Sequence, residues 1–164
     1  NIIMDTEGSS GMLRYEATQN GTPTLTIEMG EAHRFQRGFI DEAIQGVHSV
    51  FAEYGIEPDA TVQFPGWRTI VDGWGEKTWV RADAGGIVEM RFDRGALVHE
   101  GDTICRITNP FKTDAIAMEA PFTGLLVGML ENPVVYPGNP ICHIVEVDEG
   151  TRRIIEDQQQ HQPV

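Results

Sequence analysis

The second half of the chain contains VHEGDTICRI (residues 98–107), and this stretch returns as VYPGNPICHI (residues 135–144). The stretches before them match as well, ADAGGIV (residues 82–88) with APFTGLL (residues 120–126). The first matched glycine recurs after 124 − 86 = 38 positions and the second after 138 − 101 = 37, so a single gap aligns the copies. We interpret this pattern as one supersecondary unit used twice, whose two copies close an apolar face about a pseudo-two-fold axis.

The matched glycines and cysteines lead to specific expectations. Each copy should turn at its first glycine, run out as a strand, turn again at its second glycine and return. Glycine suits such positions when the backbone needs positive φ or when a Cβ atom has no room. The chain has two cysteines, Cys105 and Cys142, which are too few for a disulfide framework. We therefore expect both to be buried, reduced strand residues.

With APFTG opening its second half, the repeat resembles the biotinyl/lipoyl carrier type of barrel-sandwich hybrid over residues 79–147. This resemblance implies an all-β domain built from two hammerhead repeats. Carrier domains attach their cofactor to a lysine at a hairpin tip, and Lys112 lies near that position. Its spacing to Pro121 is one residue longer than usual there, and no Met flanks it. We interpret Lys112 as a solvated turn residue and expect the carrier fold without the carrier function.

The first third of the chain has helical periodicity around one short strand. Helices are expected at residues 12–20 and 36–54, the second from an apolar stripe with spacings of three and four. Between them, TLTI at residues 24–27 is β-branched at three of four positions, which predicts a strand. Gly21 and Gly55 are expected at the helix ends. One helix–strand–helix unit cannot bury both faces of its strand, so the rest of the sheet is missing or comes from a partner.

These patterns predict an α+β chain of four parts. Residues 1–57 would be the C-terminal slice of an α/β domain, beginning with an irregular lead-in, and residues 58–78 would be connecting strands and linker. Residues 79–147 would be the β domain, and residues 148–164 an acidic, Gln-rich tail that is weakly ordered at its end.

The composition excludes some classes of partner. The formal net charge is −13, which argues against nucleic acid because phosphates need Lys and Arg. No stretch is long and apolar enough to span a membrane, and the first residues are not a signal peptide. We expect a cytoplasmic protein. Lys occurs only at positions 77 and 112, and this acidic, lysine-poor composition favours a halophilic source. The chain starts at Asn1 rather than Met, which favours a piece of a longer protein.

Glu28 is the strongest candidate for chemistry on the residues alone. It ends the predicted strand at residues 24–27 and lies just before Gly30. Catalytic groups of α/β sheets collect at the carboxyl ends of strands. A carboxylate at the end of an apolar strand costs desolvation energy unless it has a function or a partner. The alternative is that Glu28 is exposed at the strand edge or pairs with Arg34.

The segment GTPTLTIEMGEAHRF (residues 21–35) resembles the G-x-P-x-x-T-x-E-x-G-E-x-x-R-F segment of the deacylases within the succinylglutamate desuccinylase/aspartoacylase family. Together with the following helix and the β domain, the resemblance covers residues 10–147. It implies a zinc hydrolase on a carboxypeptidase-like α/β fold, which cleaves the amide bond of a small N-acyl amino acid or related amide. The glutamate matching Glu28 would be the general base, taking a proton from the zinc-bound water and passing it to the leaving nitrogen.

The same resemblance implies what this chain lacks. The family binds zinc through His-x-x-Glu and a later His, all ahead of the catalytic glutamate, and no His precedes Glu28 here. We therefore expect no metal ligands in this chain, zinc only in a longer parent protein, and no activity from the chain alone. Arg34 is a candidate to hold a substrate carboxylate, because the planar guanidinium of Arg can donate two parallel hydrogen bonds to one carboxylate. The alternative is a structural ion pair with Glu28, Glu31 or Asp41.

Other interpretations stay open. A zinc site made from the cysteines with His99 and His143 is disfavoured, because Cys142 and His143 are adjacent in a strand and point to opposite faces. The three tryptophans, Trp67, Trp74 and Trp79, favour docking of the β domain over lining a substrate entrance. The alternative function is a non-catalytic β-sandwich module for binding or oligomerisation. An incomplete sheet has an exposed edge, so we expect a homodimer.

Overall fold

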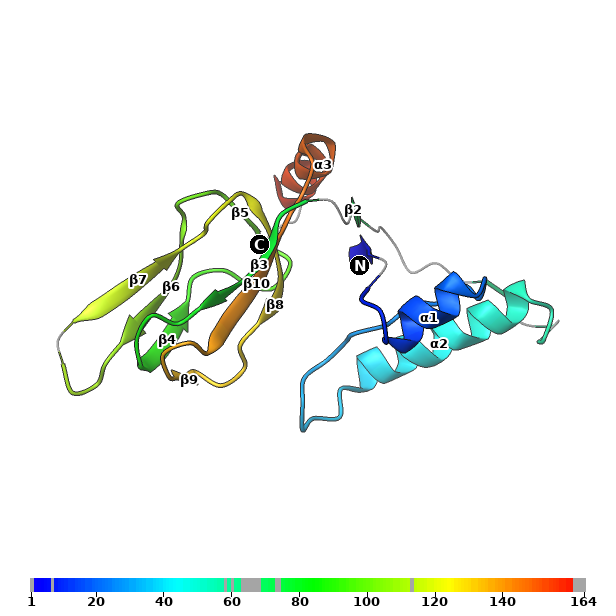
Figure 1. The fold of residues 1–164 in the computed structure, drawn as a ribbon, viewed down its shortest axis with the longest axis horizontal. Helices are drawn as coiled ribbons and strands as arrows, with labels where there is room; N and C mark the ends of the chain where they lie inside the picture. The colour runs from blue at the N-terminus through cyan, green and yellow to red at the C-terminus, as the bar shows by residue number, and fades with distance from the viewer. Residues whose placement is uncertain are drawn as a thin grey trace. The chain divides into compact units, whose positions relative to one another are not determined.

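The structure is a computed structural model, and it describes residues 2–6, 8–57, 59, 61–62, 69–72, 75–112 and 114–160. The chain divides into two compact units. One unit contains residues 1–6 together with residues 68–164, and the other contains residues 7–67. The first unit is rich in strands and the second in helices (Figure 1). The chain is thus of mixed α and β type.

The described part of the strand-rich unit has two four-stranded antiparallel sheets, with orders β3-β10-β8-β5 and β7-β6-β4-β9. The first sheet consists of β3 (Lys77–Arg81), β10 (Pro140–Glu146), β8 (Gly124–Met129) and β5 (Leu97–Val98). The second consists of β7 (Ala115–Glu119), β6 (Thr103–Thr108), β4 (Gly86–Met90) and β9 (Val134–Val135). Both sheets contribute to one apolar core, for example Leu126 from the first and Ile107 from the second.

The sequence repeat relates the strand order of one sheet to the strand order of the other. The first copy supplies β3, β4, β5 and β6, and the second copy supplies β7, β8, β9 and β10 in the same succession. Replacing each strand of the order β3-β10-β8-β5 by its counterpart in the other copy gives β7-β6-β4-β9, which is the order of the second sheet. The sequence repeat therefore corresponds to a repeat of strand topology.

The matched glycines behave as expected, each pair for its own reason. A Cβ atom on Gly86 would collide with the carbonyl oxygen of Thr108, and one on Gly124 with that of Val145. The second pair has left-handed backbone, with φ of +83° at Gly101 and +85° at Gly138. Close packing of neighbouring strands explains the first pair, and tight turns explain the second.

The matched cysteines are also where the sequence placed them. Cys105 lies in β6 and Cys142 in β10, and both are fully buried free thiols. They fill small volumes in the core that the two sheets share.

The end of the tail was predicted to be weakly ordered, but helix α3 spans Glu149–Gln160 and extends into it, and residues 161–164 lie outside the described residues. Asp148 caps its start: the backbone N–H of Thr151 donates to one carboxylate oxygen of Asp148 at 2.9 Å, and the hydroxyl of Thr151 donates to the other at 2.6 Å. Ile155 is 4% exposed and packs against a small cluster on the first sheet that includes Leu125 and Val145. Packing of Ile155 against the sheet stabilises a helix that its mostly polar sequence did not reveal.

The expected irregular lead-in is also wrong in part. Residues Ile2–Asp5 form β1, which pairs in parallel with β2 (Thr69–Asp72). The partner strand is distant in the sequence, so local pattern could not reveal this pairing. Both strands belong to the strand-rich unit.

The helical unit confirms two of its three predicted elements. Helix α1 spans Leu13–Gln19 and helix α2 spans Arg37–Glu53, with Gly21 (φ +79°) and Gly55 (φ +67°) in left-handed conformation beyond their ends. The predicted strand at residues 24–27 is wrong, since this segment has no regular structure. Among the described residues no neighbouring strand takes up its backbone hydrogen bonds, and a lone strand has no ladder to stabilise it.

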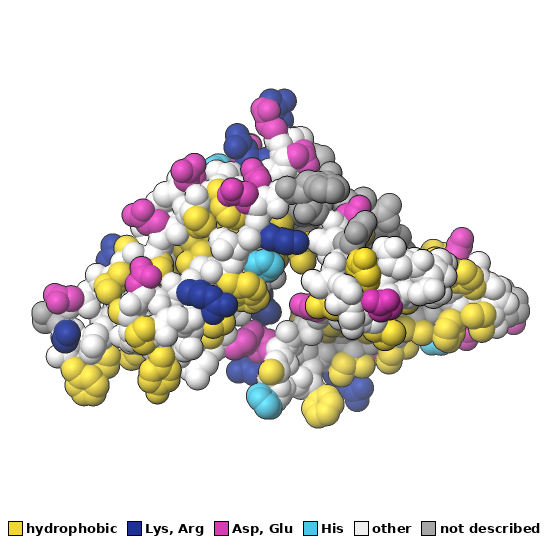
Figure 2. All heavy atoms as spheres, viewed as in Figure 1, with side chains coloured by type: hydrophobic (Ala, Val, Ile, Leu, Met, Phe, Trp, Pro, Cys, Tyr) yellow, Lys and Arg dark blue, Asp and Glu magenta, His cyan; other side chains and the backbone are white. Residues whose placement is uncertain are grey.

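Helix α2 has no buried residue. Its apolar stripe, including Ile44 (52% exposed), Val47 (49%) and Val50 (48%), faces solvent in this chain. Hydrophobic side chains are visible along the surface of this unit in Figure 2. The amphipathic pattern therefore predicts a helix correctly, while the surface it would cover is not among the described residues. No helix in the described part of the chain has the length and apolar character needed to cross a membrane.

Candidate functional site

Glu28 lies in the irregular segment between α1 and α2, and its side chain is exposed. Within the described residues, no hydrogen bond or ion pair to its carboxylate is present. Its predicted position at a strand end is therefore not seen here. The geometry leaves its carboxylate open to solvent and to any incoming group, and its catalytic role stays a prediction.

Arg34 forms an ion pair with Glu31, with 3.2 Å between Nη1 and Oε2. Of the three acidic partners considered for this residue, Glu31 is the one in contact. The side chain of Arg34 is 71% exposed and that of Glu31 is 15% exposed. Only the Arg34 end of this pair is open to solvent, so a second carboxylate can approach the guanidinium from the solvent side while Glu31 stays in place.

The segment that carries Glu28 and Arg34 has a defined path into α2. Two residues adopt left-handed backbone, Gly30 (φ +75°) and the non-glycine His33 (φ +62°). The backbone N–H of Glu31 donates to Oε1 of Gln36, the residue that precedes α2, at 2.7 Å. Gln36 thus connects the bend to the start of the helix through the backbone of Glu31.

The described residues do not fit a zinc site. Among them, no group of three or more His, Cys, Asp or Glu side chains is arranged to hold a metal ion. One His-x-x-Glu spacing occurs after Glu28, at His143 and Glu146. It forms no ligand pair, because His143 stacks on Trp79 while Oε2 of Glu146 accepts the backbone N–H of Glu76 at 2.9 Å.

The cysteines are equally unsuited to metal binding. Burial raises the pKa of Cys105 to about 11. Burial, and then the nearby Cys105, raises the pKa of Cys142 to about 12. Among the described residues, no group of three or more potential ligands forms around these thiols, which are neutral in the core at physiological pH.

Lys112 is exposed in the turn between β6 and β7, as expected for a solvated turn lysine. Asn109 shapes this turn: its side-chain oxygen accepts the backbone N–H of Phe111 at 2.9 Å, and its carbonyl oxygen accepts that of Lys112 at 3.0 Å. Phe111 beside it is 94% exposed.

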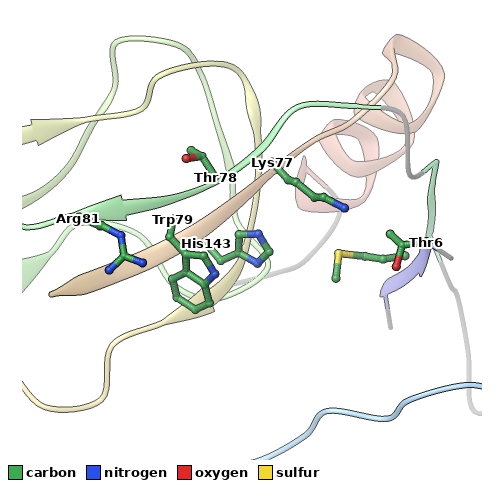
Figure 3. Close-up of a pocket in the computed structure, with 7 residues that line it drawn as sticks. Thr6, Lys77, Thr78, Trp79, Arg81 and His143 are labelled. Atoms are coloured by element: carbon green, nitrogen blue, oxygen red, sulfur yellow. The ribbon is translucent and has the colours of Figure 1, made fainter. Parts of the chain in front are cut away.

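A pocket on the strand-rich unit was missed by the sequence reasoning. Lys77, Trp79 and Arg81 alternate along β3 on the face turned away from the core. The Trp79 indole stacks on the imidazole of His143 from β10, with ring centroids 4.8 Å apart and planes 9° from parallel. Together with Thr78, and with Met4 and Thr6 at β1, these residues line an open pocket of about 510 Å³ (Figure 3). The alternation in KTWVR (residues 77–81) was the available signal. Trp67 and Trp74, considered with Trp79, lie outside the described residues.

No protein-family model matches the chain, and no curated protein sequence matches it significantly. Solved structures do match. The apo structure of the ectoine utilization protein EutE (DoeB) from Ruegeria pomeroyi has a TM-score of 0.73 at 20% identity, over 90% of this chain and 46% of that chain. A succinylglutamate desuccinylase from Silicibacter sp. TM1040 has a TM-score of 0.65 at 19% identity, over 88% of this chain and 45% of that one.

A succinylglutamate desuccinylase/aspartoacylase from Rhodobacter sphaeroides gives a TM-score of 0.68 at 17% identity, over 85% of this chain and 44% of the other. This chain therefore spans less than half the length of the structures it matches. At sequence identities of 17–20%, these matches establish a shared fold alone. The structural neighbours are succinylglutamate desuccinylase/aspartoacylase family proteins, and this chain has the fold of a part, less than half, of such a protein.

Proposed function

We propose that this chain is the C-terminal part of a hydrolase that cleaves the amide bond of an N-acyl amino acid or a related amide. The observation that carries the proposal is the fold it shares with succinylglutamate desuccinylase and aspartoacylase structures over 85–90% of its length. The resemblance of residues 21–35 to the deacylase motif is an independent line of support, because it rests on residue identities rather than on shape.

In this proposal Glu28 is the general base. It takes a proton from the water that attacks the amide carbonyl carbon, and it passes that proton to the nitrogen as the carbon–nitrogen bond breaks. The products are a carboxylate and a free amine. The side chain of Glu28 is exposed, and no described ion pair occupies its carboxylate, so a water molecule can approach it.

Arg34 is proposed to hold the carboxylate of the substrate. Its guanidinium is mostly exposed and is held near the bend by Glu31. A substrate carboxylate would replace Glu31, or share Arg34 with it, in a forked contact. The acyl group and the amine are not specified by these two residues.

The described residues offer no place for zinc, so we propose that its ligands lie in a part of the parent protein that this chain does not include. The chain alone would then be inactive. We further propose that residues 79–147 form a barrel-sandwich hybrid of two hammerhead repeats, supported by the matched strand orders of the two sheets. The free, reduced cysteines favour the cytoplasm, and the net charge of −13 favours a halophilic source.

The second candidate function is a non-catalytic module that binds a ligand or forms oligomers. The exposed apolar stripe of α2 favours it, because contiguous apolar surface of this kind usually meets a partner. On this basis we propose that the isolated chain forms a homodimer, which light scattering over a range of concentrations tests directly. A monomer at the highest concentration contradicts it.

The test of the enzymatic proposal uses the longer parent protein. Zinc content and hydrolysis of a panel of N-acyl amino acids are measured for the wild type, for Glu28→Gln and for the control Glu42→Gln, an exposed acidic residue of α2. We expect Glu28→Gln to keep its zinc and lose about 10²- to 10⁴-fold in turnover, while the control is unchanged. A parent without zinc, or a fully active Glu28→Gln variant, contradicts the proposal.

A further inference from the structure

The pocket at β3 has an unusual charge for this chain. The whole sequence has 25 acidic residues against 12 Lys and Arg, yet the described pocket lining includes Lys77 and Arg81 and no acidic residue. The nearby carboxylate of Glu146 is outside this lining and accepts a hydrogen bond from the backbone N–H of Glu76. Figure 2 shows Lys/Arg, histidine and hydrophobic side chains next to one another on the visible face of the strand-rich unit. The pocket is thus a local basic site on an acidic protein.

Arg81 is already positioned for a ligand. Its Nη1 donates to the carbonyl oxygen of Gly138 at 2.9 Å, which holds the side chain across the end of the first sheet. Arg has five N–H donors in a fixed planar fork, so this one bond leaves donors for an oxyanion. In Figure 3, Lys77 extends on the other side of Trp79, toward Thr6. A ligand that lies over Trp79 therefore has a cation on either side.

Trp79 supplies a flat apolar surface between these cations. One face of its indole lies against His143, and the side chain is still 46% exposed. Gly128 of β8 lies beneath the rings: a Cβ atom placed on it would be 3.5 Å from both the Trp79 ring and the His143 Cβ. A methyl group would fit there, whereas a larger side chain would meet the edge of the indole. The planar group that such a surface favours is a ring that stacks on it.

We propose that this pocket binds a small anion that carries a planar ring, with the ring stacked on Trp79 and the anionic group held by Arg81 and Lys77. Residues two apart in a strand are separated by roughly 7 Å, so the anionic group lies a few bonds away from the ring rather than directly on it. The pocket volume of about 510 Å³ is in the range of small-molecule sites, about 300–1,000 Å³. Adenosine monophosphate has this combination of ring, spacing and charge and is a suitable probe.

The experiment is calorimetric titration of the chain with adenosine monophosphate, adenosine and inorganic phosphate. We expect saturable binding of the monophosphate, and at least about fivefold weaker binding of adenosine and of phosphate, each of which has only one half of the contacts. Trp79→Ala and Arg81→Gln should each weaken monophosphate binding by about fivefold or more. The matched controls Tyr136→Ala and Arg106→Gln change an exposed aromatic and an exposed arginine outside the pocket and should bind like the wild type.

Thermal unfolding of every variant separates lost binding from lost folding. If Trp79→Ala does not fold, binding is compared in Arg81→Gln and Lys77→Gln instead. Both side chains are exposed, so these substitutions should leave the fold intact. The proposal is overturned if the monophosphate does not bind, if adenosine binds as tightly, or if the control variants lose as much affinity as the pocket variants.

Discussion

The indole of Trp79 lies almost parallel to the imidazole of His143, which is its direct cross-strand partner in the pairing of β3 with β10. Stacked cross-strand pairs stabilise a sheet beyond the area they bury. This pair joins an edge strand to the neighbouring strand of the first sheet. We expect it to stabilise the strand-rich unit as well as to shape the pocket.

The variant His143→Ala tests this contribution. It should lower the free energy of unfolding of the strand-rich unit by about 1 kcal/mol, because the stacking is lost while the strand remains. Urea denaturation followed by circular dichroism measures the change. Tyr136→Ala, which removes an exposed aromatic side chain outside the pair, should cost less than half as much. Equal losses in both variants would show that the stacking contributes nothing specific.

The glycine at the start of β8 should not tolerate a methyl group. In Gly124→Ala the new Cβ would overlap the carbonyl oxygen of Val145, a backbone atom of the paired strand β10. We expect a loss of about 3 kcal/mol or more in the free energy of unfolding, since the strands must separate locally. Gly95→Ala is the matched control: Gly95 has φ of +82° but nothing within 4 Å, so only backbone strain of about 1 kcal/mol is expected. A Gly124→Ala variant as stable as Gly95→Ala would contradict the close approach of the two strands.

Helix α3 should depend on pH through its cap. Hydrogen bonds from the side chain and then the backbone of Thr151 lower the pKa of Asp148 below its usual 3.8. A carboxyl group whose pKa is lower in the folded state stabilises that state above its unfolded pKa, and this contribution is lost as pH falls through the folded value. Protection of the α3 amides from hydrogen exchange should therefore decrease below about pH 4.

Two substitutions separate the charge of Asp148 from its hydrogen bonds. Asp148→Asn keeps an acceptor oxygen for the Thr151 N–H, so α3 should remain and the acid dependence should vanish. Asp148→Ala removes the cap and should destabilise the helix by about 1 kcal/mol at all pH values. If protection of the α3 amides still decreases in acid in Asp148→Asn, a group other than Asp148 causes the pH dependence.

The two cysteines should be unreactive until the chain unfolds. With pKa values of about 11 for Cys105 and about 12 for Cys142, roughly one thiol in a thousand or fewer is ionised at pH 8. Both are also fully buried. A thiol reagent should label neither in native protein and both together on addition of denaturant. Because unfolded thiols ionise near pH 9, stability should fall as pH rises above that value. Rapid labelling of one cysteine in the native state would contradict its burial.

The repeat could be predicted from the sequence because its signals are local and doubled. Glycines that allow no Cβ or need positive φ, and small buried cysteines, recur in both copies at nearly constant spacing. Helix α2 was equally clear, since its apolar stripe persists over 17 residues even though nothing described covers it.

What the sequence did not reveal depends on distant partners. Strand β1 exists through pairing with β2, and α3 is ordered by packing of Ile155 against the first sheet. Conversely, residues 24–27 have strand propensity and no described strand beside them, so propensity predicted an element that is absent. The motif around Glu28 and Arg34 was identified by residue identities, and the structure pairs Arg34 with Glu31. The alternation in residues 77–81 indicated one exposed face of a strand, but the stacking of Trp79 on His143 depends on the register of β3 and β10, which the local pattern does not give.

The arrangement of the two sheets also bears on how such a unit arises and how it can be divided. Each sheet takes two strands from each copy, with the copies interlocked rather than side by side. One copy alone has no complete sheet, so a single-copy ancestor would have had to exchange strands with a second identical chain before duplication joined the two. The turn after β6, where Phe111 and Lys112 are exposed, marks the junction of the copies. A chain cut there should yield two pieces, neither folded alone, that restore the unit when mixed.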